Sequence, residues 1–379
     1  MVKKKPILIL LYFIFFTQSL NLKCNASDIN ISAKSAILMC ADSNSIIWAK
    51  DEHRKLPIAS TTKIMTSILT IEQIEACGNS EIEITDEMVR VEGTSMGLMP
   101  KDVVTLESLV KGMLLCSGND AANAASIAVS GEKEKFIDLM NDKAKQIGML
   151  NTRFVTPSGL DQGDHHSTAY DMALLGSYAM ENESFANIAS KKSMKVEFIS
   201  PNKTVNFKNH NKLLRLYEGC IGIKTGFTKA AGRCLVSCAQ KNGVRLVAVT
   251  LNAPSDWDDH MKLYDYGFEN TISKTFDDQN INLTIKVDNS DTDTLELNSS
   301  TWFSKTFKKG DENKVIREIE LPEFCQAPIQ KGQIIGKVNY HINGKIIGSN
   351  DLTASKNIEA KPIHNFWSKV SDFFKGLFN

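Results

Sequence analysis

The residues best suited to chemistry lie in a short polar segment, residues 58–65, that opens an apolar helical run. Ser60 and Lys63 are three residues apart, so on a helix their side chains share one face and can exchange a proton. A serine hydroxyl becomes a good nucleophile when a neighbouring base takes its proton. A lysine can act as that base if burial or a nearby positive charge lowers its pKa. The pair therefore indicates nucleophilic catalysis at Ser60.

The spacing alone is weak evidence, because short motifs recur by chance. It occurs again at three other places: Ser108/Lys111, Ser130/Lys133 and Ser200/Lys203. Ser60 differs from these because two further motifs follow it in order. They are Ser117-Gly118-Asn119 and Lys224-Thr225-Gly226, and Lys-Thr-Gly occurs once in the chain. Three motifs in a fixed order are far more specific than any one of them.

The segments around these motifs alternate between helical and strand patterns. Apolar stripes predict a helix that follows Pro57 and ends at Gly78, with Ser60 in its first turn. There, free N–H groups and the positive helix end could support an anionic intermediate. Further helices are predicted over residues 106–115, 121–129, 132–147, 169–180 and 256–268, and strands over 35–39, 46–49, 222–228, 234–239 and 244–251. Residues 82–104 are expected to form short strands and loops. This order predicts an α+β domain with helices packed on an antiparallel sheet.

The two ends of the chain suggest where the protein acts. Residues 1–26 combine a basic start, an apolar stretch and small residues before Ser27, which predicts a secretory signal peptide cleaved near Ala26. A retained anchor is less favoured, because the apolar run is shorter than the roughly 20 residues of a membrane span. In residues 361–379, apolar side chains recur every three or four positions from Ile363 to Phe378. This pattern predicts an amphipathic helix on a membrane surface, with a helix docked on the preceding domain as the alternative.

The chain of 379 residues is long enough for more than one domain. We expect a catalytic domain over residues 27–270 and a C-terminal β-sandwich domain over residues 271–360, where alternating strands replace helices. Lys plus Arg equals Asp plus Glu, at 44 each, so nothing in the overall charge points to nucleic acid.

Neither a metal site nor a disulfide framework is expected. Four neighbouring residues could be imagined as metal ligands: Asp161, Asp164, His165 and His166. The adjacent histidines have no partner one helical turn away, so a solvated loop is the favoured interpretation. Loss of Cys24 with the signal peptide leaves an odd number of cysteines without repeated spacing, and Cys234 and Cys238 are predicted to be buried free thiols. No cofactor is implied.

Together the three motifs match the signature of serine penicillin-recognising enzymes, with a β-lactamase/transpeptidase-like catalytic domain. Within that superfamily the sequence resembles the low-molecular-mass penicillin-binding proteins, the secreted D-alanyl-D-alanine carboxypeptidases. The resemblance covers nearly the whole chain, and its segments are residues 60–66, 117–120, 158–160, 166–173, 224–228 and, in the β-domain, 327–345. The terminal amphipathic helix matches the usual membrane anchor of these enzymes.

The resemblance implies three catalytic residues. Ser60 attacks the carbonyl of the penultimate D-alanine, and Lys63 takes its proton. Ser117 bridges Lys63 and Lys224 and passes a proton to the departing D-alanine. The implied partners are peptidoglycan stem peptides ending in D-Ala-D-Ala, β-lactam antibiotics and a membrane surface. The implied location is the outer face of the bacterial cytoplasmic membrane, at the cell wall.

Five residues are implied to bind the substrate: Asn119, Lys224, Thr225, Gly226 and Phe227. Asn119 would hold the amide side chain, Lys224 would add positive potential, and Thr225 would bind the terminal carboxylate. Gly226 would keep the strand edge bare for a peptide to lie against. The backbone N–H groups of Ser60 and Phe227 would form the oxyanion hole.

Two departures and two alternatives accompany this interpretation. Phe227 occupies a position that is often polar, although its backbone donor is kept. Residues 252–260 hold no arginine, where some members carry one that binds the carboxylate. A class A β-lactamase is the alternative enzyme, and Glu183-x-x-x-Asn187 mimics its deacylating element, but too far along the chain. A non-catalytic cell-wall-binding protein of the same fold is the other alternative, although it would ordinarily have lost part of the site.

Overall fold

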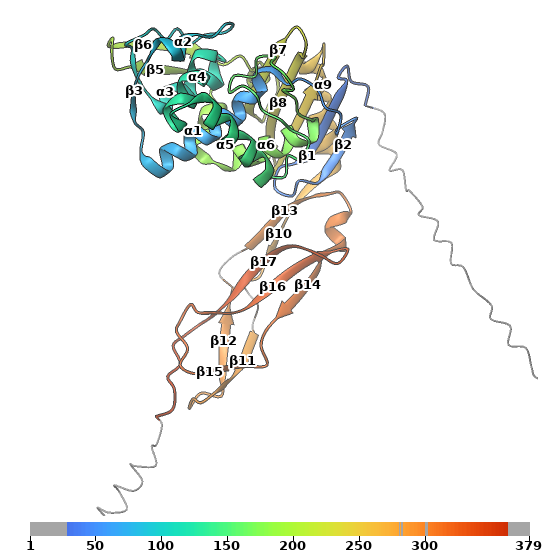
Figure 1. Cartoon of the computed structure of the whole chain (residues 1–379). Coiled ribbons are helices and arrows are strands. Elements are labelled where there is room, and N and C mark those ends of the chain that lie inside the picture. Colours follow the sequence, from blue (N-terminus) through green and yellow to red (C-terminus); the bar gives the residue numbers. More distant parts are fainter. Residues whose placement is uncertain (1–28, 280, 282, 300–301, 363–379) are drawn as a thin grey trace, which may run out of the picture.

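The computed structural model describes residues 29–279, 281, 283–299 and 302–362. Within them a helix-rich unit is followed by a slender all-β unit, stacked end to end (Figure 1). The predicted signal peptide with its cleavage site and the predicted amphipathic helix from Ile363 both lie outside the described residues.

A five-stranded antiparallel sheet organises the helix-rich unit. Its strand order is β2-β1-β9-β8-β7, so β7 lies at an edge. The strands are β1 (Ser35–Cys40), β2 (Ile46–Lys50), β7 (Cys220–Thr228), β8 (Gly232–Lys241) and β9 (Val244–Leu251). Since β7 carries Lys-Thr-Gly, the fold leaves one side of this motif free of a pairing strand, where a peptide can lie.

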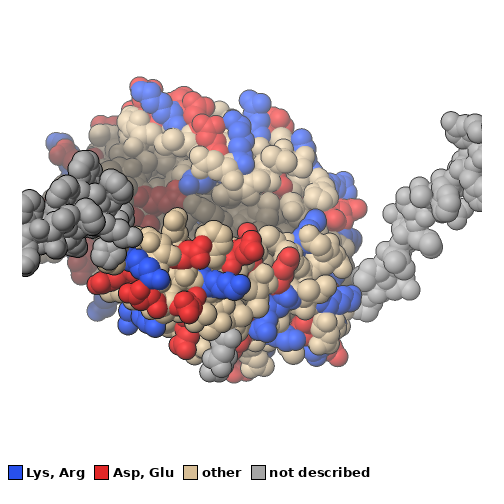
Figure 2. Space-filling view, turned by 90° about the horizontal axis from the view of Figure 1, so that it is seen from below, with Lys and Arg blue, Asp and Glu red and all other residues tan. Residues whose placement is uncertain are grey.

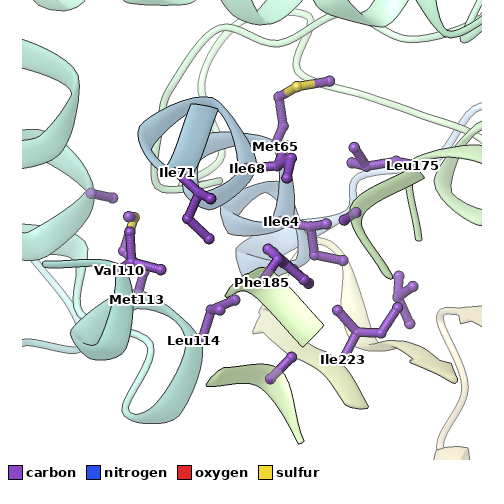
Figure 3. Close-up of a cluster of buried hydrophobic side chains, with 14 of the residues drawn as sticks. Ile64, Met65, Ile68, Ile71, Val110, Met113, Leu114, Leu175, Phe185 and Ile223 are labelled. Atoms are coloured by element: carbon purple, nitrogen blue, oxygen red, sulfur yellow. The ribbon is translucent and has the colours of Figure 1, made fainter. Parts of the chain in front are cut away.

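Helices cover both faces of this sheet, as the sequence predicts. Helix α9 (Asp256–Asn270) packs on one face, where Tyr264 and Leu263 are fully buried. On the other face α6 (Ala169–Glu181) packs against β1, β8 and β9, and α1 (Lys63–Cys77) and α7 (Glu183–Ala189) contact β7. Three further helices, α3 (Leu106–Leu115), α4 (Asn119–Ser130) and α5 (Lys133–Gln146), pack on α1. The apolar stripe of α1 lies at the centre of this core, with Val110, Phe185 and Ile223 around it (Figure 3).

The structure differs from the sequence prediction in detail. Ser60 does not begin an α-helix; it lies in a 3₁₀ turn, Ala59–Thr62, that precedes α1. The segment before α3 holds β3 (Glu81–Glu83), α2 (Asp86–Val89) and β4 (Val103–Thr105). A hairpin of β5 (Ser193–Phe198) and β6 (Lys203–Lys208), together with α8 (Leu213–Leu216), was not predicted. Short elements such as these are stabilised by tertiary packing, and their sequence patterns are too brief to stand out.

The β-domain follows α9 without a linker. A ribbon of β10 (Thr271–Asp277) and β13 (Trp302–Lys308) adjoins a six-stranded sheet of order β14-β16-β17-β12-β11-β15. The strands of that sheet are β11 (Leu283–Asp288), β12 (Thr294–Asn298), β14 (Ile316–Glu320), β15 (Phe324–Gln326), β16 (Ile334–Ile342) and β17 (Lys345–Ala354). Its core includes one buried carboxylate, Asp278, which accepts hydrogen bonds from the Tyr340 hydroxyl and from Asn350 (2.8 Å) and pairs with Arg317 (3.1 Å). These partners satisfy a charge that would otherwise destabilise the domain.

Contacts at the domain junction are polar. The Thr306 N–H at the top of β13 donates to the Asp42 carboxylate in the turn between β1 and β2, at 2.7 Å. Seen from the β-domain end, the surface mixes Lys and Arg with Asp and Glu, without a large patch of one sign (Figure 2). None of the helices within the described ranges is long and apolar enough to cross a bilayer. All seven cysteines of this part of the chain are free, and Cys234 and Cys238 are buried in β8 as predicted.

Candidate active site

The serine sits in a strained turn that its neighbours hold in place. Ala59, directly before Ser60, has φ +49°, in the left-handed region that side chains other than glycine rarely adopt. Such a conformation costs roughly 1–3 kcal/mol and persists only where the surroundings fix it. The Thr61 hydroxyl donates to the Ile58 carbonyl at 2.6 Å, and the Thr62 hydroxyl donates to the Ala59 carbonyl at 2.8 Å. Gly159 also lies against this carbonyl so closely that a Cβ would overlap it.

His165 also supports this turn. For this residue the prediction of a solvated loop was wrong. The expected solvated loop is buried at His165, which is 7% exposed. Its Nδ1 accepts from the Val155 N–H (3.0 Å), so its Nε2–H donates to the Thr62 hydroxyl (2.8 Å). Burial lowers the pKa of His165 to about 4, which keeps the imidazole neutral in this tautomer. No group of residues in the described ranges is arranged to hold a metal.

Lys63 is fully buried beside the serine. Its Nζ lies 3.0 Å from Ser60 Oγ, 2.6 Å from Asn119 Oδ1 and 2.7 Å from the Ser158 carbonyl oxygen. Burial lowers the pKa of Lys63 well below its usual value, and the charge of nearby Lys224 lowers it further. A neutral amine can donate to Asn119 and Ser158 while its lone pair accepts the Ser60 proton. The geometry therefore suits a base that activates Ser60.

The second wall of the site comes from the turn between α3 and α4. Ser117 has φ +64°, and Asn119 begins α4. The Asn119 N–H donates to the Thr94 carbonyl at 2.7 Å, and its Nδ2 donates to the Glu92 carbonyl at 2.7 Å. The Asn119 Oδ1 accepts from Lys63, so the amide is fixed between this lysine and the loop at residues 92–94.

Asp120 fixes that loop and was not singled out as a functional residue. Its carboxylate is 2% exposed and accepts hydrogen bonds from the Ser95 hydroxyl and from the backbone N–H groups of Met96, Gly97 and Leu98. A carboxylate with this many donors is stable without a counter-ion. Asp120 therefore ties the Ser-Gly-Asn turn to the loop, which explains why an acidic residue follows the motif.

The third wall is the edge strand β7, whose successive side chains point to opposite faces of the sheet. Lys224 and Gly226 face the helices, whereas Thr225 and Phe227 face the opposite way. A Cβ on Gly226 would lie 2.9 Å from the Ile58 carbonyl and 3.1 Å from the Ser60 nitrogen, so a side chain there would displace the serine turn. The Phe227 side chain is 67% exposed and covers nothing in the core.

Lys224 is a second buried lysine, 1% exposed. Burial lowers its pKa to about 7. Its Nζ donates to the Thr225 carbonyl at 2.8 Å. Ser117 lines the same cavity, but the lysine hydrogen bonds run to Ser60, Asn119, Ser158 and Thr225. The bridge through Ser117 between the two lysines therefore stays a prediction.

These walls enclose a cavity of about 330 Å³ that contains an arginine the sequence analysis missed. The cavity is lined by Ser60, Thr94, Ser117, His210, Lys212, Thr225, Gly226, Phe227, Arg233, Asp256 and Trp257. Arg233 lies on β8 directly opposite Phe227 of β7. Directly opposed residues share one face of a sheet, so Arg233 lies on the Thr225 side of the strand. The sequence analysis considered an arginine only at residues 252–260, whereas the pairing of β8 with β7 places Arg233 in the cavity.

Asp256 and Trp257 hold the Arg233 guanidinium in place and leave some of its N–H donors available. Its Nε and Nη2 donate to Asp256 Oδ1 at 2.9 and 2.7 Å, and the guanidinium lies over the Trp257 ring, 5.4 Å from its centroid. In the described part of the chain only Asp256 accepts hydrogen bonds from Arg233. A guanidinium has five N–H donors, so those that remain can bind a carboxylate beside Thr225.

A family model described as D-alanyl-D-alanine carboxypeptidase matches residues 22–255, and one described as penicillin-binding protein 5, C-terminal domain, matches residues 271–360. The chain belongs to the D-alanyl-D-alanine carboxypeptidase family. It is 31% identical to the carboxypeptidase DacF of Bacillus subtilis, over 88% of this chain and 87% of the relative. It is 34% identical to DacC of Escherichia coli, over 91% and 88%. Penicillin binding protein 5 from Haemophilus influenzae has a similar structure, with TM-score 0.68, 29% identity, and coverage of 87% of this chain and 98% of that chain.

Membership confirms the resemblance found in the sequence and the predicted fold, an α+β penicillin-recognising domain followed by an all-β domain. This carboxypeptidase is a serine hydrolase of the penicillin-binding type. The β-lactamase alternative is not favoured, because family and relatives alike are carboxypeptidases. Glu183, its proposed deacylating residue, is exposed at the start of α7 and does not line the catalytic cavity.

Arg233→Gln should weaken recognition of a free C-terminal carboxylate while the amide can still bond to Asp256. A charged hydrogen bond is worth about 1.5–3 kcal/mol, so kcat/KM for an acyl-D-Ala-D-Ala peptide should fall about 10- to 100-fold. The measurement is the ratio of kcat/KM between this peptide and its C-terminal amide, which should shrink. Arg153→Gln, outside the cavity, is the control. An unchanged ratio would show that Arg233 does not contact the carboxylate.

Proposed function

We propose that this chain removes the terminal D-alanine from peptidoglycan stem peptides ending in D-Ala-D-Ala, with Ser60 as nucleophile and Lys63 as general base. The observation that carries the assignment is the 3.0 Å approach of the buried Lys63 amine to the Ser60 hydroxyl. Of the serines in Ser-x-x-Lys motifs, Ser60 lines the cavity, whereas Ser108 lies in the first turn of α3 and donates to the Glu197 carbonyl, and Ser130 and Ser200 do not line the cavity.

In acylation, Lys63 takes the Ser60 proton while Oγ attacks the carbonyl carbon of the penultimate D-alanine. The C–N bond breaks, and the nitrogen of the terminal D-alanine leaves with a proton that Ser117 passes on. Water then attacks the ester, with Lys63 again taking a proton, and Ser60 regains its hydrogen. One water is consumed, and one free D-alanine and one shortened stem are released.

The substrate-binding roles follow from the same walls. Asn119, fixed at the start of α4, faces the amide of the stem, and the bare edge at Gly226 lets the peptide lie along β7. The backbone N–H groups of Ser60 and Phe227 serve the oxyanion. Lys224, Thr225 and Arg233 receive the terminal carboxylate. A β-lactam has an amide and a carboxylate at similar positions, so the same groups would accept it and form a slowly hydrolysed acyl-enzyme.

Ser60→Ala should abolish both D-alanine release and covalent labelling by a fluorescent penicillin, and leave the fold intact. Mass spectrometry of a pentapeptide muropeptide incubated with the protein should show loss of one D-alanine for the wild type only. The matched control is Ser200→Ala, an exposed serine with the same spacing to a lysine, and it should retain full activity. Continued penicillin labelling of the Ser60→Ala protein would refute the nucleophile assignment.

The pH dependence of kcat/KM should be bell-shaped. Lys63 must be neutral to act as base, so activity rises with pH as this residue, with its lowered pKa, loses its proton. Lys224 must be charged to attract a carboxylate, so activity falls above its pKa of about 7. In Lys224→Arg the cation persists and the descending limb should disappear. A flat profile from mildly acidic to mildly alkaline pH, with chemistry rate-limiting, would contradict the role of Lys63.

We also propose that the protein is exported by residues 1–26 and held at the outer face of the cytoplasmic membrane by residues 363–378. The support is the sequence pattern of both segments and the family's substrate, which lies outside the cytoplasm. The mixed surface charge of the β-domain end gives little attraction for anionic lipid, so apolar contact should dominate the attachment.

Removal of residues 363–379 should move the protein from the membrane fraction to the soluble fraction. Hydrolysis of a small soluble peptide should be unchanged, because the cavity lies in the catalytic domain. High salt should not release the full-length protein, since screening weakens charge attraction and not apolar contact. If the truncated protein still sediments with membranes, the terminal helix is not the anchor.

A further inference from the structure

A further cavity lies at the junction of the two domains, where β10 and β13 meet the catalytic domain (Figure 1). Its volume of about 330 Å³ is within the usual range of small-molecule sites. Five segments contribute to it: the β1–β2 turn, the end of α6, the β8–β9 hairpin, β10 and β13. The lining residues are Ala41, Asp42, Glu181, Gln240, Gly243, Arg245, Ser273 and Ser304. We call this space the junction cavity; among the described residues it shares none with the catalytic cavity.

The walls of the junction cavity are joined to one another by close contacts. The Ala41 N–H donates to the Arg245 carbonyl at 3.0 Å, which attaches the β1–β2 turn to β9. The Asp42 carboxylate in that turn accepts a backbone N–H of β13 at 2.7 Å. A Cβ on Gly243 would lie 3.2 Å from Ser273 Oγ, so the β8–β9 hairpin also approaches β10 closely. The cavity is therefore part of the domain interface, and a ligand in it would touch both domains.

The junction cavity holds one cation and two anions that do not pair with one another. Arg245 is half-buried; its Nε donates to Gln240 Oε1 at 3.3 Å, and its Nη1 donates to the Met180 carbonyl at 3.4 Å. A guanidinium has five N–H donors, so several of them stay available. Within the described ranges, neither Asp42 nor Glu181 forms an ion pair with a basic group. Unpaired charges of both signs around one cavity favour a ligand that itself carries both signs.

The rest of the lining is small and mostly polar. Gln240 contributes an amide, and Ser273 and Ser304 contribute hydroxyl groups. Among the described lining residues, the only hydrocarbon side chain is the methyl group of Ala41. A large apolar side chain of a ligand would therefore find little to pack against. These groups fit a small molecule that has an ammonium group, a carboxylate and at most a short side chain, which describes a small amino acid.

We propose that the junction cavity binds free D-alanine as a zwitterion, with its carboxylate on Arg245 and its ammonium group on Glu181 and Asp42. The choice of D-alanine among small amino acids rests on the proposed function, because that reaction releases one D-alanine in each turnover. Its methyl group faces Ala41. Since the walls of the cavity come from both domains, bound D-alanine stabilises the contact between the catalytic domain and the β-domain.

The two cavities offer different partners to a free amino acid. In the catalytic cavity a carboxylate meets Arg233, but the acidic residue beside it, Asp256, is already paired with this arginine. In the junction cavity the two acidic side chains are not paired with Arg245, so they can hold an ammonium group while the arginine holds the carboxylate. Each cavity thus depends on its own arginine, which allows the two sites to be distinguished by substitution.

The test is a titration of the full chain with D-alanine, followed by saturation-transfer NMR and by the midpoint of thermal unfolding. D-alanine should bind the wild-type protein saturably and raise its midpoint. Arg245→Gln and, separately, Glu181→Gln should each weaken this binding about tenfold and reduce the rise. Acetate and methylammonium, which carry one charge each, should bind about tenfold more weakly than D-alanine. Because Glu181 is exposed, its variant is informative even if Arg245→Gln does not fold.

Two variants are matched controls. Arg233→Gln makes the same change in the catalytic cavity, and Glu183→Gln makes the same change at an exposed acid that lines neither cavity. Both should keep the D-alanine affinity and the thermal shift of the wild type. Loss of binding in Arg233→Gln with full binding in Arg245→Gln would place D-alanine in the catalytic cavity and overturn this proposal, as would the absence of saturable binding to wild type. Release of D-alanine from a pentapeptide is measured separately, so either result leaves the carboxypeptidase assignment standing.

Discussion

Two lysine side chains buried in one small site set the main constraint on this structure. A buried ammonium is poorly solvated, so burial lowers the pKa of both lysines, and the charge of Lys224 lowers that of Lys63 further. A neutral Lys63 is what its proposed role as general base requires. The polar groups around it, Asn119 and the Ser158 carbonyl, satisfy the amine without a carboxylate that would hold it protonated. Asp120 is close enough to raise the pKa of Lys63, but its oxygens are occupied by the loop at residues 95–98.

The backbone is strained in two of the walls around Ser60. Ala59 and Ser117 both lie in the left-handed region, and each is fixed by groups from distant parts of the chain. The His165 imidazole reaches the serine turn through the Thr62 hydroxyl, and Gly159 leaves room for the Ala59 carbonyl. The loop that carries them therefore supports the Ser60 turn without lining the cavity. Rigid support of this kind is what a site needs when its reacting atoms must be held within a fraction of an ångström.

The edge position of β7 links the fold to the substrate. An edge strand can accept a peptide, and the absence of a side chain at Gly226 brings that peptide against the Ser60 turn. Its neighbour β8 supplies Arg233 on the other face, and α9 supplies the Asp256 carboxylate and the Trp257 ring that hold the arginine. Recognition of the substrate is thus distributed over elements that are far apart in the sequence.

The sequence by itself determined the chemistry and most of the architecture. The spacing of Ser60 and Lys63 indicated a nucleophile and a base, and the family resemblance of the three motifs added Ser117, Asn119 and the Lys-Thr-Gly strand. The long helices were predicted because their apolar stripes repeat over several turns. The structure brings these residues to one cavity or its buried wall.

Only the tertiary structure revealed the positions of Arg233 and His165. The pairing register of β7 and β8 places Arg233 on the same face as Thr225, and His165 bonds to Thr62, which is 103 positions away in the sequence. Contacts of this kind depend on how elements pack, and nothing in the local pattern of either partner encodes them.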